Sequence, residues 1–483
     1  MNIRSPLTRD LFTRIRGAGA STALLCLAFS PSLIHASPHL EDEEGRTLIL
    51  RGINLGWKAS PYVPDVDDDD FEQIASWGFN TIRFLIFWAA IEPEQGVYDE
   101  DYLARIRPYL DMAYDHHLDV ILDMHQDVYG EMFNHDGAPA WACPEALTQG
   151  FENQEEWWMD YFTPQVMACF SWFWNDSSLQ EHFIESWRLA ARELGNHPAV
   201  IGVDLLNEPY PGFNWSPDFE PNKLQPLYEN LIPTIREEAP NALIFFEPWV
   251  LRDYFISSYL EPMPFEGLVY FPHYYNIGLE LNQTYSGNPA TIHDWMNQIA
   301  EEAQDMDVPF AVGEYSGVTE SEGITLFLED FNQSLDAAMT GGMYWEYRRE
   351  DQGYGILDAE GEPKEWIVDA LVRAWPSRVA GALQGFEFDE DTHRLQVDYT
   401  LDASIDAPTE ITAPHMLYPD GIEVSLSAPD QMEADYDEER GVLVIRDHGP
   451  DQAPRTIIVQ PSASEGNTGE RWTARRSRED RMR

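Results

Sequence analysis

The chain has 483 residues, and its 85 acidic side chains against 30 lysines and arginines give a formal net charge of −55. A hydrophobic content of 43% supplies enough apolar surface for large buried cores, which excludes an intrinsically disordered acidic protein. A surface with this much negative charge would repel the phosphate backbones of nucleic acids. We therefore expect no nucleic-acid partner. We interpret the acid excess as a halophilic-type adaptation to high salt, separate from any mechanism.

The first 36 residues differ from the rest because they begin with arginines and continue with an apolar run from Ala18 to Phe29. That run is too short to span a membrane, and it leads to Ile34-His35-Ala36, a small-residue ending typical of signal-peptide cleavage. We therefore predict a signal peptide over 1–36 and a secreted or periplasmic protein. An uncleaved amphipathic start is the alternative.

Two cysteines, Cys143 and Cys169, remain after that segment. An even pair in an exported protein permits one disulfide, and two free buried thiols are the alternative. Their spacing does not match a zinc site, and nothing else in the chain calls for a metal or cofactor.

Short β-branched and aromatic runs alternate with amphipathic stretches such as Tyr102–Tyr114 and Leu179–Leu194. We expect strands at Leu48–Leu55, Thr81–Ile86, Asp119–His125, Val200–Asn207, Ala242–Glu247, Gly267–His273, Pro309–Glu314 and Gly341–Glu346. Eight strand–helix units predict an α/β fold, a (β/α)8 TIM barrel over 37–376. A doubly wound sheet is the alternative, but no strand is followed by a Gly-x-Gly-x-x-Gly or P-loop motif.

The pattern changes after Trp375-Pro376. From there to 461, short alternating strands are separated by Asp, Pro and Gly turns, which predicts a small C-terminal β-sandwich over 377–461. Residues 462–483 are polar and end in arginines, so we expect a disordered polar tail.

Three predicted strands carry a glutamate at their carboxyl end: Asn207-Glu208-Pro209, Phe246-Glu247-Pro248 and Gly313-Glu314-Tyr315. In a barrel, side chains at the carboxyl ends of the strands face one shared cleft. Glu208 would follow strand four and Glu314 strand seven, a placement that can set two carboxyl groups roughly 5–5.5 Å apart, as retaining glycoside hydrolysis requires. A helix cap or a structural ion pair is the alternative for any single glutamate, whereas two at the right strand ends favour catalysis.

Longer motifs give the chain a resemblance to glycoside hydrolase family 5, and within it to the endoglycoceramidases. The motifs are Leu50-Arg51-Gly52-Ile53-Asn54, Asn80-Thr81-Ile82-Arg83-Phe84, Asp123-Met124-His125-Gln126-Asp127-Val128-Tyr129, Gly137-Ala138-Pro139-Ala140-Trp141-Ala142, Asn207-Glu208-Pro209, His273-Tyr274-Tyr275, Gly313-Glu314-Tyr315 and Tyr344-Trp345. Asn-Glu-Pro is shared by many barrel hydrolases, while the segments around His125 and Trp141 are similar to the glycolipid-cleaving branch.

The resemblance implies that Glu208 is the acid/base and Glu314 the nucleophile. It further implies that Asn207 bonds the sugar 2-hydroxyl and that Tyr275 and Arg83 hold Glu314 as a carboxylate. The remaining implied binding residues are His125 and His273 in the cleft, Trp345 as the aromatic floor under the sugar, Lys58 and Asp127 on sugar hydroxyls, and Trp141 as a further aromatic. The alternatives are an ordinary surface lysine for Lys58, a hydrogen-bonded core histidine for His125 and a core aromatic residue for Trp141.

These features predict a secreted retaining hydrolase that cuts the β-glycosidic bond between oligosaccharide and ceramide, with a glycolipid substrate and peripheral contact with lipid assemblies. The alternatives within the same chemistry are a β-glucosidase on glucosylceramide or steryl glucoside and a β-1,4-glucanase. A non-catalytic carbohydrate-binding protein is the alternative from another class, and the presence of both glutamates argues against it. The aromatic-rich stretch Phe151–Trp174 predicts either core packing or the wall of an alkyl-chain groove.

Overall fold

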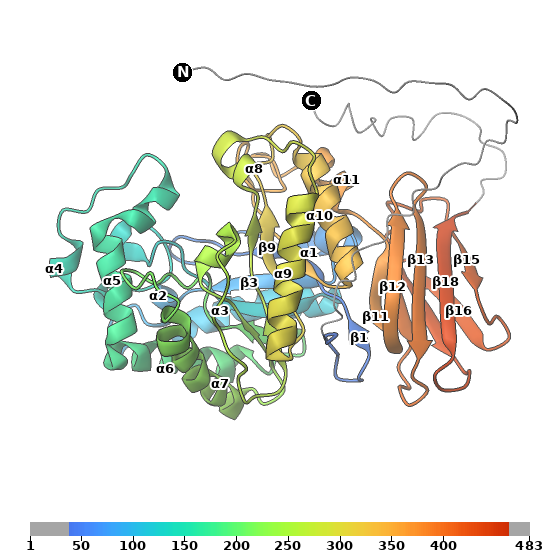
Figure 1. The fold of residues 1–483 in the computed structure, drawn as a ribbon, viewed down its shortest axis with the longest axis horizontal. Coiled ribbons are helices and arrows are strands. Elements are labelled where there is room, and N and C mark those ends of the chain that lie inside the picture. Colours follow the sequence, from blue (N-terminus) through green and yellow to red (C-terminus); the bar gives the residue numbers. More distant parts are fainter. Residues whose placement is uncertain (1–37, 463–483) are drawn as a thin grey trace, which may run out of the picture. The chain divides into compact units, whose positions relative to one another are not determined.

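The computed structural model describes residues 38–462 (Figure 1). The predicted signal peptide at 1–36 and all but the first residue of the predicted polar tail lie outside the described residues. Within 38–462, no helix combines the length and apolar character needed to cross a membrane.

The central sheet has nine parallel strands in the order β7-β6-β5-β4-β3-β2-β10-β9-β8. Their bounds are β2 Arg51–Leu55, β3 Thr81–Ile86, β4 Asp119–Met124, β5 Val200–Asp204, β6 Leu243–Phe246, β7 Leu268–Tyr270, β8 Tyr274–Tyr275, β9 Val312–Ser316 and β10 Gly342–Tyr344. A parallel bridge between Tyr270 and Phe310 joins the two edges. β7 lies within the expected strand Gly267–His273, and β8 begins directly after that range and continues it. Counted as one strand, they make the sheet the predicted eight-stranded TIM barrel.

The strands are buried on both faces, which is why their sequences are almost continuously apolar. Side chains from several strands meet inside the barrel, among them Ile121, Phe245, Val269, Phe271 and Met343. Gly313 lies where an added Cβ would come within 2.7 Å of the His273 ring, so the strand that carries Glu314 passes directly beside this histidine.

Helices cover the outside of the barrel (Figure 1). Their bounds are α1 Asp68–Ser76, α2 Trp88–Ile91, α3 Glu100–Asp115, α4 Glu145–Thr148, α5 Pro164–Asn175, α6 Ser177–Leu194, α7 Gln225–Glu238, α8 Ile277–Asn282, α9 Ala290–Met306, α10 Ile324–Ala338 and α11 Glu365–Leu371, with short helical turns η1 Glu131–Phe133, η2 Ala140–Ala142, η3 Trp157–Phe162, η4 Glu220–Leu224 and η5 Val250–Tyr254. Asp176 caps α6 by accepting the amide hydrogens of Ser178 and Leu179, a contact that typically contributes about 1 kcal/mol. The apolar face of α6, which includes Phe183 and Trp187, is buried.

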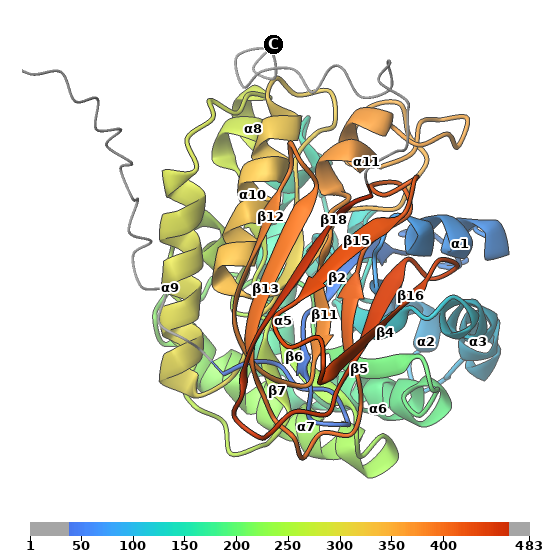
Figure 2. The same cartoon turned by 90° about the vertical axis from the view of Figure 1, so that its right-hand side faces the viewer.

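The C-terminal part consists of two antiparallel sheets, as predicted for a sandwich. Figure 2 shows the four-stranded sheet β12-β13-β18-β15, and the second sheet has the order β1-β11-β14-β17-β16. The bounds are β1 Thr47–Leu48, β11 Trp375–Val379, β12 Gly381–Asp389, β13 Arg394–Leu401, β14 Thr409–Thr412, β15 Ile422–Leu426, β16 Met432–Asp437, β17 Val442–Asp447 and β18 Pro454–Pro461. Every second residue of β13 is buried, the pattern of a sheet with one face on a core.

One expected strand is divided between the two parts of the fold. The run Leu48–Leu55 splits into β1, which pairs with β11 of the sandwich, and β2, which joins the barrel. The segment Thr47–Leu48 therefore ties the sandwich to the barrel, together with buried ion pairs such as Arg373 with Glu390 at 2.6 Å.

Cys143 and Cys169 form a disulfide, with their Cα atoms 5.4 Å apart. This bond attaches the loop after η2 to helix α5 across 26 positions of sequence. The structure thus selects the first of the two alternatives that the sequence left open.

Candidate active site

The two candidate catalytic glutamates converge on one histidine. Glu208 follows β5 and Glu314 lies within β9, and Nδ1 of His273 is 3.1 Å from a Glu208 oxygen and 3.5 Å from a Glu314 oxygen. These carboxylates are 106 positions apart in the chain, and the closure of the barrel brings them to a common site. Both side chains are largely buried, with 12% of Glu208 and 4% of Glu314 exposed.

The backbone at Glu208 is in the left-handed region, with φ of +43°, which a non-glycine residue adopts only under constraint. Two side chains supply that constraint. The Glu208 amide donates to Glu247 Oε2 at 2.8 Å, and its carbonyl accepts from Gln126 Nε2 at 3.1 Å. Glu247 and Gln126 therefore hold the turn that points Glu208 into the site.

Glu314 is held by two donors from different strands. Arg83 Nη1 donates to its Oε1 at 2.7 Å, and the Tyr275 hydroxyl donates to its Oε2 at 2.6 Å. Charge-assisted bonds of this kind favour the ionised carboxylate. Burial and then the Glu314 charge raise the pKa of Tyr275 well above its usual range, so its hydroxyl keeps the proton that it donates.

Arg83 is fully buried at the centre of the site, and four carboxylates surround it: Glu314, Glu247, Asp204 and Asp123, all within 3.0 Å. Burial alone would lower the pKa of Arg83, but these charges outweigh it and hold the pKa well above the usual value. The guanidinium is therefore a permanent cation that organises several strand ends at once.

The protonation states of Glu208 and His273 follow from the same surroundings. Burial is the largest cause that raises the pKa of Glu208, and the charge of Glu314 adds to it, so a protonated acid is favoured. Burial alone would lower the pKa of His273, but Glu247 and Glu314 outweigh it and raise the pKa well above its usual range. His273 is then a cation that donates toward both glutamates.

Asn207 is buried beside the pair. Its Oδ1 accepts from Arg83 Nη2 at 2.9 Å, and its Nδ2 donates to the Gln126 carbonyl at 2.9 Å. These two bonds fix the rotamer of Asn207. The resemblance implies that this side chain contacts a sugar hydroxyl.

A second group of predicted residues lies around the Trp345 ring. The His125 ring stacks on it with centroids 5.3 Å apart, and Lys58 Nζ lies 4.6 Å from its centroid. Lys58 also donates to Asp127, whose other neighbour is His125 at 3.6 Å. The Trp345 ring, the basic side chains beside it and the Asp127 carboxylate together form a polar slot. A slot of this kind can bind sugar hydroxyls.

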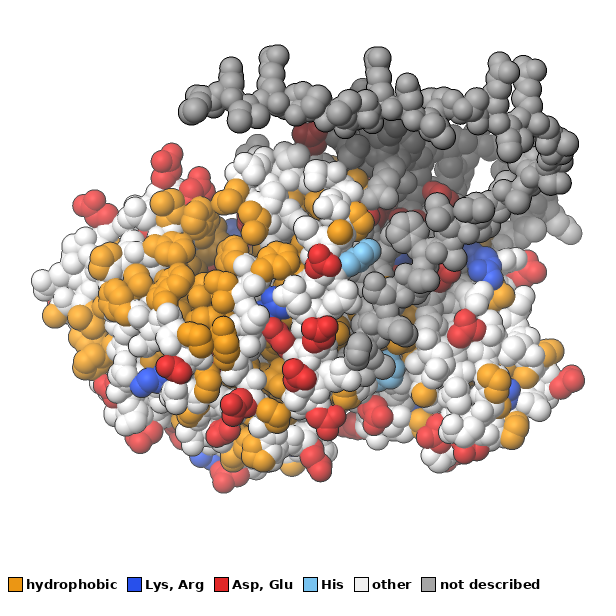
Figure 3. Space-filling view, viewed as in Figure 1, with side chains coloured by type: hydrophobic (Ala, Val, Ile, Leu, Met, Phe, Trp, Pro, Cys, Tyr) orange, Lys and Arg blue, Asp and Glu red, His pale blue; other side chains and the backbone are white. Residues whose placement is uncertain are grey.

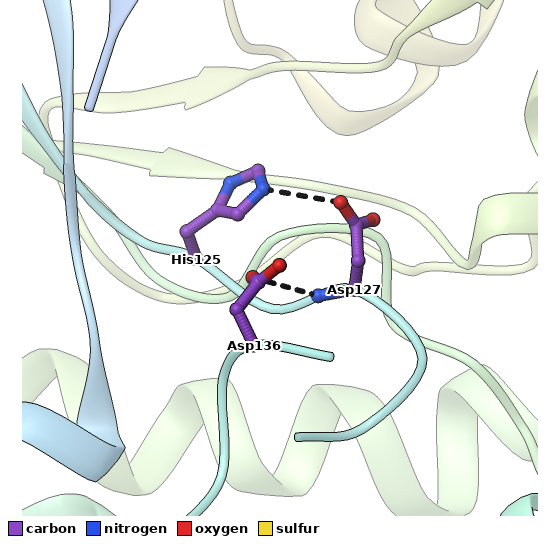
Figure 4. A group of neighbouring side chains, drawn as sticks. All are labelled: His125, Asp127 and Asp136. Atoms are coloured by element: carbon purple, nitrogen blue, oxygen red, sulfur yellow. Dashed lines mark hydrogen bonds and ion pairs between the residues drawn. The ribbon is translucent and has the colours of Figure 1, made fainter. Parts of the chain in front are cut away.

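Asp136 is a member of this group that the sequence analysis missed. Figure 4 shows it beside His125 and Asp127, where its carboxylate accepts the Asp127 amide hydrogen at 3.1 Å. Burial, followed by the neighbouring Asp127 charge, raises the pKa of Asp136 to about 7 against the opposing effect of Lys58. Its position directly before Gly137-Ala138-Pro139 is the one sequence signal that could have found it.

Trp141 is not joined to the other predicted residues. Its indole donates to the Glu92 carbonyl at 2.9 Å, and its ring packs on Trp88 and His182. Within residues 38–462, no hydrogen bond or ring contact links it to Glu208, Glu314 or the Trp345 group. Glu247, the remaining strand-end glutamate, contacts Arg83, His273 and the Glu208 amide, which is the role of a structural support.

Among the described residues 38–462, three groups of His, Asp and Glu side chains lie close enough to share a ligand: His125 with Asp127 and Asp136, Glu208 with Asp253 and His273, and Asp123 with Asp204 and Glu247. In each group a protein cation supplies the positive charge, namely Lys58, His273 or Arg83. We therefore assign no metal to them.

A protonated glutamate and an ionised glutamate around one slot can protonate a glycosidic oxygen and attack the anomeric carbon. The fold and the site together define a barrel glycoside hydrolase. The model of the cellulase family, glycosyl hydrolase family 5, matches residues 41–347, and that of the glycoside hydrolase family 5 C-terminal domain matches residues 373–459. The chain belongs to glycosyl hydrolase family 5, and it is a glycoside hydrolase.

Its relatives include Endoglycoceramidase I of Rhodococcus hoagii, 28% identical over 80% of this chain and 81% of that protein. An endoglycoceramidase of Cyanea nozakii is 25% identical over 77% of this chain and 82% of its own length. Among solved structures, endo-glycoceramidase II from Rhodococcus sp. in complex with ganglioside GM3 is similar with a TM-score of 0.81 and 29% identity, over 88% of this chain and 100% of that one. The predicted likeness to endoglycoceramidases is confirmed.

Proposed function

We propose that this enzyme cleaves the β-glycosidic bond between oligosaccharide and ceramide in glycosphingolipids and retains the anomeric configuration. The observation that carries the proposal is the convergence of Glu208 and Glu314 on His273, next to an apolar surface on the acid/base side. The similarity to endoglycoceramidases, one of them solved with a ganglioside, supports the substrate class.

The reaction begins with the sugar over Trp345 and the glycosidic oxygen beside Glu208. Glu314 attacks the anomeric carbon as the carbon–oxygen bond to the aglycone breaks, and the Glu208 proton moves to the departing oxygen. A glycosyl ester on Glu314 results. Glu208, now a carboxylate, takes a proton from water as the water oxygen attacks the same carbon and releases Glu314.

The aglycone side of the site is apolar. Tyr210 lies two positions after Glu208, and its ring packs on Trp215 with centroids 5.8 Å apart. Trp215 in turn contacts Phe162, with ring centroids 6.0 Å apart, so the aromatic contacts run from the loop that follows Glu208 to η3. We define the aromatic surface by its exposed members: Trp157, Trp158, Phe162, Trp172, Phe213 and Trp215.

Hydrophobic side chains gather on the face over α4 and α5 (Figure 3). Phe162 and Phe213 are 55% and 56% exposed. Exposed apolar side chains that gather in one region mark an interaction site. An alkyl chain beside a polar sugar slot is the kind of ligand that such an arrangement fits. The same surface supports peripheral contact with lipid assemblies, where Trp side chains are favoured at the interface. The export predicted from residues 1–36 would bring this surface to lipid assemblies outside the cell.

Product analysis tests the substrate. The purified enzyme, incubated with mixed glycosphingolipids and separately with glucosylceramide, a steryl glucoside and a soluble β-1,4-glucan, should release intact oligosaccharide and free ceramide from the first. Mass spectrometry identifies both products. Preferential release of glucose from the monosaccharide lipids, or degradation of the glucan alone, would replace the proposed substrate with that alternative.

A further inference from the structure

Asp253 is a third carboxylate beside the acid/base. It lies in η5, which follows β6, and it is 4% exposed. Oxygens of Asp253 and Glu208 and a ring nitrogen of His273 all lie within 4.8 Å of one another. Among residues 38–462, the Asp253 carboxylate has no hydrogen-bond or ion-pair partner, which is unusual for a buried acid.

Asp253 is held in place by contacts of its neighbours in η5. None of these contacts uses the Asp253 carboxylate. The Val250 amide donates to the carbonyl of Pro209 at 3.1 Å, which ties η5 to the residue after Glu208. The neighbouring Arg252 points away and donates to Glu302 at 2.9 Å. Glu302 also accepts from the Ser258 amide, so it anchors the loop from the side opposite to the site.

The charges that face Asp253 come from several elements. Glu208 and His273 are adjacent to it, and Glu247 and Glu314 lie further inside the site. The half-buried Glu280 accepts from the Tyr354 hydroxyl at 2.6 Å and also lies close enough to Glu208 for their charges to interact. Carboxylates outnumber cations around the Glu208–Asp253 pair, so two ionised oxygens cannot lie side by side there without a proton between them.

We propose that Asp253 is a positioning residue for the acid/base, which shares a proton with Glu208 and so keeps this glutamate protonated at a pH where a lone glutamate would have ionised. The proposal rests on the assignment of Glu208 as acid/base under the proposed function. Burial, and then the charge of Glu208, raises the pKa of Asp253 well above its usual range, in agreement with a protonated Asp253 in the resting pair.

The protons balance through both steps. In the resting enzyme, Glu208 and Asp253 each carry one. When Glu208 transfers its proton to the departing oxygen, the Asp253 hydroxyl remains as a donor to the new Glu208 carboxylate. When water attacks the glycosyl ester, Glu208 takes a proton from that water and the resting pair is restored. At higher pH the pair loses one proton, and the remaining proton is shared, so Glu208 still acts as an acid.

The test is the pH dependence of kcat/KM for two lactosides, octyl β-lactoside and 2,4-dinitrophenyl β-lactoside. An octyl alcohol departs only with a proton from Glu208, whereas dinitrophenolate departs without one. For octyl lactoside, Asp253→Asn should shift the alkaline limb of the kcat/KM profile to lower pH by about one pH unit. At a fixed pH on that limb, this shift is a tenfold loss in kcat/KM. With dinitrophenyl lactoside, the limb should stay in place.

Two further variants separate this role from a structural one. Glu302→Gln loosens the same loop without touching the pair and should leave the alkaline limb unmoved. Asp253→Glu should restore the limb toward wild type, and Asp253→Ser provides a second removal of the carboxylate if Asp253→Asn does not fold. The proposal is overturned if the limb is unchanged in Asp253→Asn and Asp253→Ser, or if Glu302→Gln shifts it equally.

Failure of the proposed function gives a different result. If Glu208 were not the acid/base, Glu208→Gln would keep wild-type turnover of octyl lactoside, whatever Asp253→Asn does. If only the ceramide assignment were wrong, the octyl lactoside profiles would still report on the pair, because neither probe contains ceramide.

Discussion

Arg83 Nη1 lies 2.7 Å from Oε1 of Glu314, and the same guanidinium contacts Glu247 and Asn207 on neighbouring strand ends. A planar guanidinium can serve three oxygens in fixed directions, whereas an ammonium cannot. The orientation of the proposed nucleophile therefore depends on the shape of this side chain as well as on its charge.

Arg83→Lys should lower kcat/KM for 2,4-dinitrophenyl β-lactoside by about 100-fold, because losing preorganised donors in a site of this kind costs roughly 10²–10³ in rate. Arg373→Lys is the matched control, since Arg373 is an equally buried arginine paired with Asp336 and Glu390 away from the site. It should leave kcat/KM unchanged. Equal losses in the two variants would show that the effect comes from destabilised folding.

Glu314→Gln should reduce turnover of both lactosides on the order of a thousandfold or more while lactose still binds, because the amide cannot form the glycosyl ester. Turnover is followed by product release, binding by calorimetry, and the configuration of the wild-type product by NMR, where the β-anomer should appear first. Initial release of the α-anomer would contradict a retaining mechanism.

Glu208→Gln should slow the hydrolysis of octyl β-lactoside by roughly 10²–10⁴-fold, the usual contribution of general acid catalysis. The first step with the dinitrophenyl lactoside should be nearly unaffected and appear as a burst of dinitrophenolate, since only the second step then needs the base. A variant that is equally slow in that burst would remove Glu208 from the acid role.

Phe162→Asn together with Trp215→Asn should lower kcat/KM for a ganglioside in detergent-free vesicles about tenfold or more, while hydrolysis of octyl lactoside changes little. The physical reason is the lost apolar contact area, at about 25 cal/mol per Å². Tyr114→Ser removes a 54% exposed aromatic side chain at the end of α3 and serves as control. If that control lowers ganglioside hydrolysis as strongly, the aromatic surface has no special role.

Asp136→Asn should raise the melting temperature at pH 8, and the difference from wild type should shrink as the pH falls from 7 toward 4. The pKa of Asp136 is raised from its usual value to about 7 by burial and by Asp127. A carboxylate whose pKa is higher in the folded state destabilises that state fully above pH 7 and not at all below its unfolded pKa. Thermal unfolding at several pH values measures this, and a pH-independent difference would contradict it.

The sequence alone determined much of the fold, because its local patterns depend on neighbours only a few residues away. The run Thr81–Ile86 is β3 without adjustment, and the run Asp119–His125 is β4 with one residue fewer. Both are buried on both faces, as parallel strands covered by helices are. The split of Leu48–Leu55 into β1 and β2 was missed, because pairing with β11 is a long-range contact without a local signal.

The aromatic stretch Phe151–Trp174 illustrates the same limit. Its members divide between the two interpretations: Phe170, Phe173 and Trp174 are buried, as core packing requires, while Trp157, Phe162 and Trp172 are exposed. The wall of an alkyl-chain groove stays a prediction. Within α5, helical periodicity separates the buried Phe173 from the exposed Trp172. In η3, however, only packing against the loop that carries Trp215 decides which rings remain exposed.

For the site, the motifs identified the residue types, and their roles as catalytic and sugar-binding groups stay predictions. The convergence of Glu208 and Glu314 on His273, the four carboxylates around Arg83 and the approach of Asp253 to Glu208 were decided by tertiary structure alone. Strand ends are close in sequence to their own strand but distant from one another, and only closure of the barrel makes them neighbours. Burial and charge, which set the protonation of these groups, exist only once that closure has excluded water.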